Sequence, residues 1–190
     1  MRHPLRSWAL ALAGLAWAGP GWPLGEPLSG QPPAVGIGGE LDLVDQLGRP
    51  FSLARLSGRP ALVFFGFTRC GSTCPVALLS ARQVLAEFGS RPAPGIVFVT
   101  LDPVSDGPAQ LREYLGHVDG RLIGLTGSPA QVSRVADRYG VGTRQAASGA
   151  GVEHSSLWYL LDARGRVSRV YPHNETPQHL LADLRRLEEH

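Results

Sequence analysis

Two cysteines four residues apart are the residues of this chain best suited to chemistry. Cys70 and Cys74 are its only cysteines; they follow the apolar run at residues 60–67 and precede a helical pattern that begins at Pro75. Thiols with this spacing at the start of a helix can lie on one face. The positive end of the helix dipole is expected to lower the pKa of the thiols. Thiolates are soft ligands that suit Cu(I), and they are also the form that attacks a disulfide.

A structural disulfide is the competing interpretation of this pair, because cysteines of exported proteins usually pair. Such a bridge would close only a very small loop, so it would stabilise the fold little. The position of the pair between a strand and a helix also favours a functional role. Structural zinc requires four protein ligands, and the chain has two cysteines to offer.

His154 is the candidate third ligand, although it lies far along the chain from Cys74 and just before the apolar segment at 156–162. Only a fold can bring it to the cysteines, and a histidine at such a place is more often structural or exposed than a ligand. Four other histidines lie among polar neighbours in helical or turn positions and are expected on the surface: His117, His173, His179 and His190.

Two aspartates follow the second buried strand pattern, at residues 95–101. Asp106 is predicted to cap the helix at 107–118. Asp102 ends its strand near the edge where the cysteines are expected. We predict a cap or turn role for it, with contact to a partner or to a residue near the site as the alternative.

Strands alternate with helices along most of the chain. Strands are expected at 60–67, 95–101 and 122–126, helices at 75–88, 107–118 and 128–140, hairpins within 41–53 and across 156–171, and a last helix from Thr176 onward. This order predicts an α/β, thioredoxin-like fold with a mixed central sheet flanked by helices and a late β-hairpin. In such a fold the cysteine pair opens the first helix.

The N-terminus has the layout of a secretory signal. A short basic region precedes the apolar run at 8–18, which ends in Ala16-Trp17-Ala18. A membrane span needs about 20 apolar residues, so this run is short for an anchor. We predict a signal peptide at 1–18, a Gly/Pro-rich linker at 19–39 and one domain at 40–190, in the periplasm or on the outer face of the inner membrane. A retained anchor reaching Leu24 is the alternative and would provide a membrane tether.

Composition excludes some classes of partner. The formal net charge is +2, and all 18 basic residues are arginines scattered without a long basic run, so no nucleic acid is expected. A domain of about 150 residues buries roughly 70% of its unfolded surface. The core therefore does not depend on a metal or a disulfide to fold.

The chain resembles the Sco/SenC family, a branch of the thioredoxin superfamily. The resemblance spans about residues 35–187. It is carried, in the family's order, by GFTRCGSTCP, TLDPVSD, REYLG, LIGLTGSPAQV, RYGV and VEHSSLWYLLDARGRV. It implies one copper ion, Cu(I) or Cu(II), held by Cys70, Cys74 and His154. It also implies that the two cysteines are redox-active and form a disulfide when oxidised.

Four positions depart from the family pattern. The usual Pro-Asp after the first cysteine is Gly71-Ser72 here, the aspartate before the histidine is Glu153, and the arginine of the DPxRD segment is Ser105. The cysteines and the histidine themselves are retained. The differences therefore concern the flexibility and charge around the site and the surface offered to a partner.

Sco-like proteins deliver copper to the dinuclear copper centre of cytochrome c oxidase, or reduce the thiols that receive it. The resemblance therefore implies a metallochaperone rather than an enzyme. Its expected partners are the copper-accepting subunit of the oxidase and other periplasmic copper or thiol-redox proteins.

The alternative function is a thiol–disulfide oxidoreductase that uses Cys70 and Cys74 without delivering copper. The CxxxC spacing and the lack of a proline in residues 153–156 speak against a dedicated enzyme of that kind. A peroxidase of the peroxiredoxin type is disfavoured by the spacing of Thr68 and Cys70.

Overall fold

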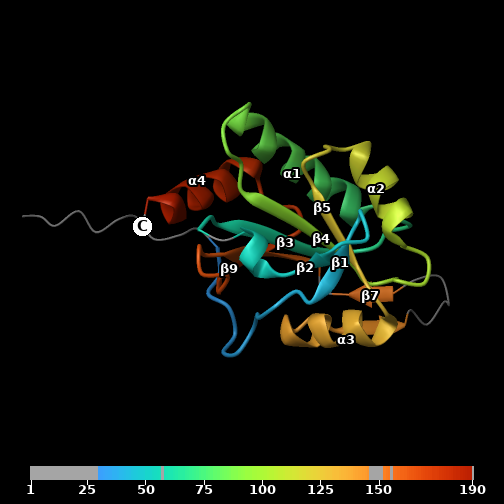
Figure 1. Cartoon of the computed structure of the whole chain (residues 1–190). Coiled ribbons are helices and arrows are strands. Elements are labelled where there is room, and N and C mark those ends of the chain that lie inside the picture. The colour runs from blue at the N-terminus through green and yellow to red at the C-terminus, as the bar shows by residue number, and fades with distance from the viewer. Residues whose placement is uncertain (1–29, 57, 146–151, 155, 190) are drawn as a thin grey trace, which may run out of the picture.

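The computed structural model describes residues 30–56, 58–145, 152–154 and 156–189 (Figure 1). Its centre is a seven-stranded sheet with the strand order β2-β1-β5-β4-β3-β8-β9. The strands are β1 (Leu43–Asp45), β2 (Pro50–Phe51), β3 (Ala61–Gly66), β4 (Gly95–Thr100), β5 (Ile123–Thr126), β8 (Leu157–Leu161) and β9 (Val167–Pro172). Strands β3, β4 and β5 run parallel, whereas β1 and β8 pair antiparallel with them.

Four helices cover this sheet on both faces. They are α1 (Thr73–Phe88), α2 (Pro108–Gly116), α3 (Pro129–Arg138) and α4 (Pro177–Glu188), and a short 3-10 helix spans Leu53–Leu56. Figure 1 shows α1, α2 and α4 over one face of the sheet and α3 over the other. The predicted mixed sheet, its flanking helices and the late hairpin, formed by β8 and β9, are confirmed. Within the described ranges no helix is long and apolar enough to cross a membrane.

The buried central strand explains the continuous apolar run in the sequence. Side chains of β3 alternate between two core clusters, with Leu62 and Phe64 on the side of α1 and Val63 and Phe65 on the side of α3. Because helices cover both faces, every position of this strand is buried. The strand is thereby held rigidly up to Gly66, where the segment that carries the cysteines begins.

Parallel pairing brings two loops to one edge of the sheet. Gly66 lies opposite Thr100 at the carboxyl ends of β3 and β4, and the amide of Leu101 donates to the carbonyl oxygen of Gly66 at 2.7 Å. The loop at 67–72 and the loop at 101–107 therefore leave the sheet side by side. The cysteine pair belongs to the first of them.

Of the two helix caps predicted from the sequence, one is confirmed and one is wrong. Ser128 caps α3 as predicted, in a reciprocal arrangement with Gln131. The prediction that Asp106 caps α2 is wrong, because the N-cap is Gly107 and no side chain caps this helix. The carboxylate of Asp106 instead turns toward the loop that follows β3.

Part of the segment predicted as a linker lies against the sheet and α3. Gln31 and Val170 exchange backbone hydrogen bonds of 3.0 and 2.9 Å, which places residue 31 beside β9. Farther along, the hydroxyl of Tyr139 donates to the carbonyl oxygen of Gly39 at 2.9 Å, and Ile37 packs on the core near α3. Residues 30–39 therefore add to the packing of the domain.

A buried carboxylate organises the β1–β2 hairpin. Asp45 is 1% exposed and accepts hydrogen bonds from the amides of Leu47 and Arg49 and from the guanidinium groups of Arg49 and Arg55, each at 2.9 Å. Burial alone would raise the pKa of Asp45, but the bonds from Arg49, Arg55 and Leu47 together lower it well below its usual range.

Replacing Asp45 with Asn should lower the free energy of unfolding by about 2 kcal/mol near neutral pH, because an ionised acceptor of four bonds is lost. A lowered folded-state pKa gives stability that is present above the unfolded-state pKa of about 3.9 and lost as the pH falls below it. Urea unfolding from pH 7 to pH 3 should therefore show the gap between the two proteins closing below about pH 4.

Asp42→Asn is the matched control, since Asp42 is exposed and its ion pair with Arg138 spans 3.3 Å. It should change stability by less than about 0.5 kcal/mol at every pH. A gap for Asp45→Asn that stays constant down to pH 3 would contradict the assignment.

Candidate thiol and metal site

The structure brings the two cysteines together at the start of α1. Cys70 lies in the loop after β3 and is partly exposed, whereas Cys74 is the second residue of α1 and is fully buried. The amide of Cys74 donates to the Sγ atom of Cys70 over 3.4 Å. Both cysteines are free thiols. The pair thus presents one accessible sulfur with a second sulfur beneath it.

Burial dominates the ionisation of the inner thiol. It raises the pKa of Cys74, and the neighbouring Cys70 acts in the same direction, while a hydrogen bond with the backbone of Phe67 lowers it by less. The expectation that the helix N-terminus lowers the pKa is therefore wrong for Cys74. The apolar surroundings of the sulfur outweigh the favourable end of the helix dipole.

The absence of a side chain at Gly66 makes room for the inner thiol. A Cβ atom at this position would lie 2.6 Å from the Sγ atom of Cys74 and 3.0 Å from the ring of Phe98. Both distances are shorter than ordinary contacts, so only glycine lets the sulfur pack against the end of β3. The glycine that begins the sequence motif is thus a packing requirement of the thiol site.

A second buried carboxylate ties the cysteine loop to the neighbouring strand. Asp106 is 0% exposed and accepts from the amide of Thr68 at 2.9 Å, from the hydroxyl of Thr68 at 2.5 Å and from the hydroxyl of Thr100 at 2.7 Å. Thr68 lies two residues before Cys70. This network fixes the backbone from which the cysteine loop departs.

An exposed arginine lies directly before the first cysteine. Its Nη2 atom donates to Oδ2 of Asp102 and to the hydroxyl of Ser105, both at 2.6 Å, so Arg69 bridges the two loops. Burial would raise the pKa of Asp102, but the bonds from Arg69 and Ser105 lower it. The turn role predicted for Asp102 is confirmed by the amide of Asp106, which donates to its carbonyl oxygen at 2.8 Å.

Tyr114 of α2 is a neighbour of the site that the sequence patterns did not single out. Its ring packs against Phe98 with a centroid distance of 6.0 Å. Burial raises the pKa of Tyr114 to about 12, and electrostatic interactions with Cys74, Cys70 and Asp106 act in the same direction. The helical period of the REYLG segment was the available signal, since it places Tyr114 beside the buried Leu111 and Leu115.

His154 is described through its backbone alone. It ends β7 (Val152–His154), which pairs with β6 (Thr143–Gln145) in a small sheet that was not predicted. Phe64 lies opposite Trp158, so the amino end of β8 is beside the carboxyl end of β3. The chain just before β8 therefore approaches the edge that carries the cysteines.

The side chain of His154 lies outside the described part of the structure, and its ligand role stays a prediction. Among the side chains that are described, no group of three histidine, cysteine or carboxylate residues is arranged to hold a metal. His117 and His179 are exposed as predicted, and His173 is partly buried. His190 lies outside the described residues.

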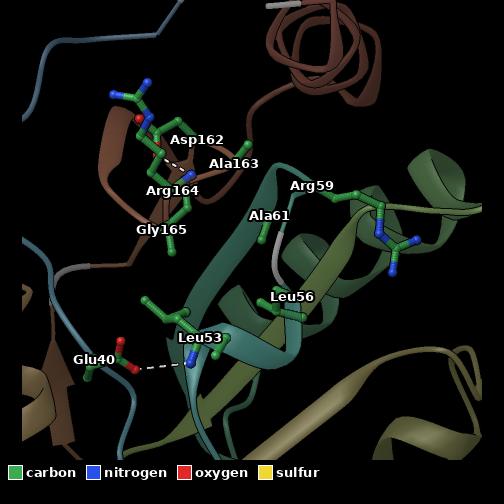
Figure 2. Close-up of a pocket in the computed structure, with 11 residues that line it drawn as sticks. Glu40, Leu53, Leu56, Arg59, Ala61, Asp162, Ala163, Arg164 and Gly165 are labelled. Atoms are coloured by element: carbon green, nitrogen blue, oxygen red, sulfur yellow. Dashed lines mark hydrogen bonds between the residues drawn. The ribbon is translucent and has the colours of Figure 1, made fainter.

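The pocket in Figure 2 lies at the opposite end of the sheet, so it is separate from the thiol site. It has a volume of about 180 Å³ and lies between the Leu53–Leu56 turn and the β8–β9 turn. Its carboxylates are satisfied locally. Glu40 accepts from the amide of Leu53, and Asp162 accepts from the amides of Arg164 and Arg166. These contacts suit a structural role.

Comparisons of the sequence and the structure with known proteins all find members of one family. The SCO1/SenC family model matches residues 29–189. A SCO2-like protein of Rickettsia conorii is 33% identical over 170 residues, covering 84% of this chain and 83% of the relative.

Two solved structures with copper bound are also similar. ScoI of Bradyrhizobium japonicum has a TM-score of 0.71 and 34% identity, and covers 80% of this chain and 99% of its own. ScoI of Arabidopsis thaliana has a TM-score of 0.72 and 28% identity, and covers 81% of this chain and 99% of its own.

Gly66→Ala should lower the free energy of unfolding by about 1–3 kcal/mol, because the new methyl group overpacks the contact between β3 and the thiol of Cys74. Urea unfolding of the reduced protein measures this. Gly71→Ala is the control, since a Cβ atom at Gly71 meets no atom within 4 Å. It should change stability by less than about 0.5 kcal/mol. Equal effects of the two substitutions would show that the contact with the Cys74 sulfur does not require glycine at position 66.

Proposed function

The chain belongs to the SCO1/SenC family, and on this premise we propose that it binds one copper ion through Cys70, Cys74 and His154. The observation that supports this most is the pair of free, adjacent thiols at the start of α1. Two soft sulfur donors suit Cu(I), and an imidazole nitrogen would complete a three-coordinate site that can also hold Cu(II). The solved relatives from Bradyrhizobium and Arabidopsis contain copper.

We further propose that the protein is exported and passes copper to the copper-accepting subunit of cytochrome c oxidase. Transfer would proceed by exchange of ligands, in which a partner's donor atom attacks the metal from the accessible side. The exposed thiol is the one that a partner reaches first, because Cys74 is covered. Arg69 stands beside it with its side chain 69% exposed, which suits contact with an acidic partner surface.

Anaerobic titration of the reduced full-length chain with Cu(I), in competition with a chromophoric chelator, should show one equivalent bound. Cys70→Ser combined with Cys74→Ser should abolish this binding, because the thiolates are the soft donors. His154→Ala should weaken binding by at least about tenfold while the stoichiometry stays the same.

His117→Ala is the matched control for the histidine, because His117 is exposed at the end of α2. It should bind Cu(I) as the unchanged protein does. Unchanged Cu(I) affinity in His154→Ala, or an equal loss of affinity in His117→Ala, would contradict the three-ligand site.

The second candidate function is thiol–disulfide exchange by the same pair. It is favoured by the two sulfur atoms being close and unequal in exposure. In this reaction the thiolate of one cysteine attacks a partner's disulfide, one partner sulfur leaves, and the second cysteine resolves the mixed disulfide. The accessible Cys70 would be the attacking residue, since burial raises the pKa of Cys74.

Single-cysteine variants test this assignment. With iodoacetamide at pH 7.5, Cys70 in Cys74→Ser should react at least about tenfold faster than Cys74 in Cys70→Ser. The raised pKa leaves Cys74 protonated, and burial blocks the reagent. Mass spectrometry over time gives both rates. Equal rates would contradict the assignment of Cys70 as the attacking residue. In urea, where the protein is unfolded, the two cysteines should react at similar rates.

A further inference from the structure

We propose that Asp106 is a positioning residue that fixes the cysteine loop and, as a buried negative charge, shifts the site's preference from Cu(I) toward Cu(II). The copper part of this inference rests on the proposed function. The sequence had suggested a helix cap for this residue, and the structure gives it no part in capping. Its carboxylate is directed instead into the junction between β3, β4 and the cysteine loop.

The positioning part follows from the three hydrogen bonds. Oδ2 of Asp106 accepts from the amide of Thr68 and from the hydroxyl of Thr100, while Oδ1 accepts from the hydroxyl of Thr68. Thr100 ends β4, so the carboxylate clamps the start of the cysteine loop to a buried strand. The amide of Cys70 in turn donates to the carbonyl oxygen of Phe67 at 3.1 Å, which continues the ordered backbone to the first thiol.

The charge part follows from burial and from the lack of a paired cation. In each of the three hydrogen bonds described above the partner donates to the carboxylate, which is the pattern that suits an ionised carboxylate. In the described part of the chain no arginine forms an ion pair with Asp106, because Arg69 is directed to Asp102 instead. The negative charge of Asp106 also acts on Cys74 and Tyr114, which places it within electrostatic range of the inner thiol.

The two oxidation states of copper respond differently to such a charge. Cu(I) held by two thiolates is a complex with one net negative charge, whereas Cu(II) held by the same thiolates is neutral. One electron from an external reductant converts the second form into the first, and both sulfur bonds are kept. A fixed carboxylate nearby therefore disfavours the Cu(I) form and has little effect on the Cu(II) form.

Asp106→Asn removes the negative charge of this side chain and can keep its three hydrogen bonds. The amide oxygen can accept the bonds from the amide of Thr68 and the hydroxyl of Thr100. The amide NH₂ can donate to the hydroxyl of Thr68, which is able to accept as well as donate. Two valine variants leave the charge in place and remove hydrogen bonds instead. Thr68→Val removes the bond from the Thr68 hydroxyl to Asp106. Thr100→Val removes the bond from the Thr100 hydroxyl to Asp106 and also the bond that this hydroxyl accepts from the amide of Asp102.

The test compares the affinities of the full-length variants for Cu(I) and for Cu(II), measured without oxygen in competition with bicinchoninate and with glycine respectively. Asp106→Asn should raise the ratio of Cu(I) to Cu(II) affinity by about tenfold, the size expected of one charge across several ångströms of partly buried protein. The two valine variants should weaken both forms alike and leave the ratio within about twofold. If Asp106→Asn does not fold, Asp106→Ser is the second neutral variant.

An unchanged ratio in the neutral variant, or an equal change in Thr68→Val, would overturn the charge role. If no variant binds copper, the proposed function fails, and the inference is then judged on the metal-free protein. In the Cys70→Ser background, alkylation of Cys74 at one fixed pH should be several-fold faster with Asp106→Asn than with Thr68→Val, because the carboxylate opposes the thiolate of Cys74. Equal rates would reject the inference independently of copper.

Discussion

Strands β3 and β4 run parallel, with Gly66 opposite Thr100, and this register governs the geometry of the whole site. Two parallel strands that end at the same edge of a sheet bring the loops that follow them side by side. Here the first loop brings the thiols and Arg69, and the second brings Asp102 and Asp106. The helices on either face contribute by burying β3 completely, so the starting point of the cysteine loop cannot shift.

Within that frame the inner cysteine is placed under two opposing requirements. A soft metal or a disulfide partner needs the sulfur without its proton, yet Cys74 lies in apolar surroundings that retain the proton. The outer cysteine is the accessible one, so a reacting group would meet it first. The arrangement favours a bound state of the pair, with metal or with a second sulfur, over a free thiolate at the inner position.

Much of the fold was predictable because its signals are local. The unbroken apolar run of β3 indicated a strand covered on both faces, and Ser128 with Gln131 indicated the start of α3. The cap predicted for Asp106 was wrong for the same reason. An aspartate before Gly-Pro has the local pattern of a helix cap, whereas the partners of this carboxylate, Thr68 and Thr100, come from other elements. The raised pKa of Cys74 was likewise beyond local patterns, because it depends on side chains that only the packed sheet supplies. For His154 the structure supplies the path of the backbone, and the ligand role continues to rest on the family resemblance.

The contact between Gln31 and Val170 covers part of an edge of the central sheet. Strand β9 is the last strand of the sheet, and the outer row of amides and carbonyls of such a strand can template the addition of another chain. Gln31 occupies the middle of that row with two backbone hydrogen bonds. A chain shortened to begin at Glu40 would uncover this edge. Its tendency to self-associate would then rise even though the core and the thiol site were intact.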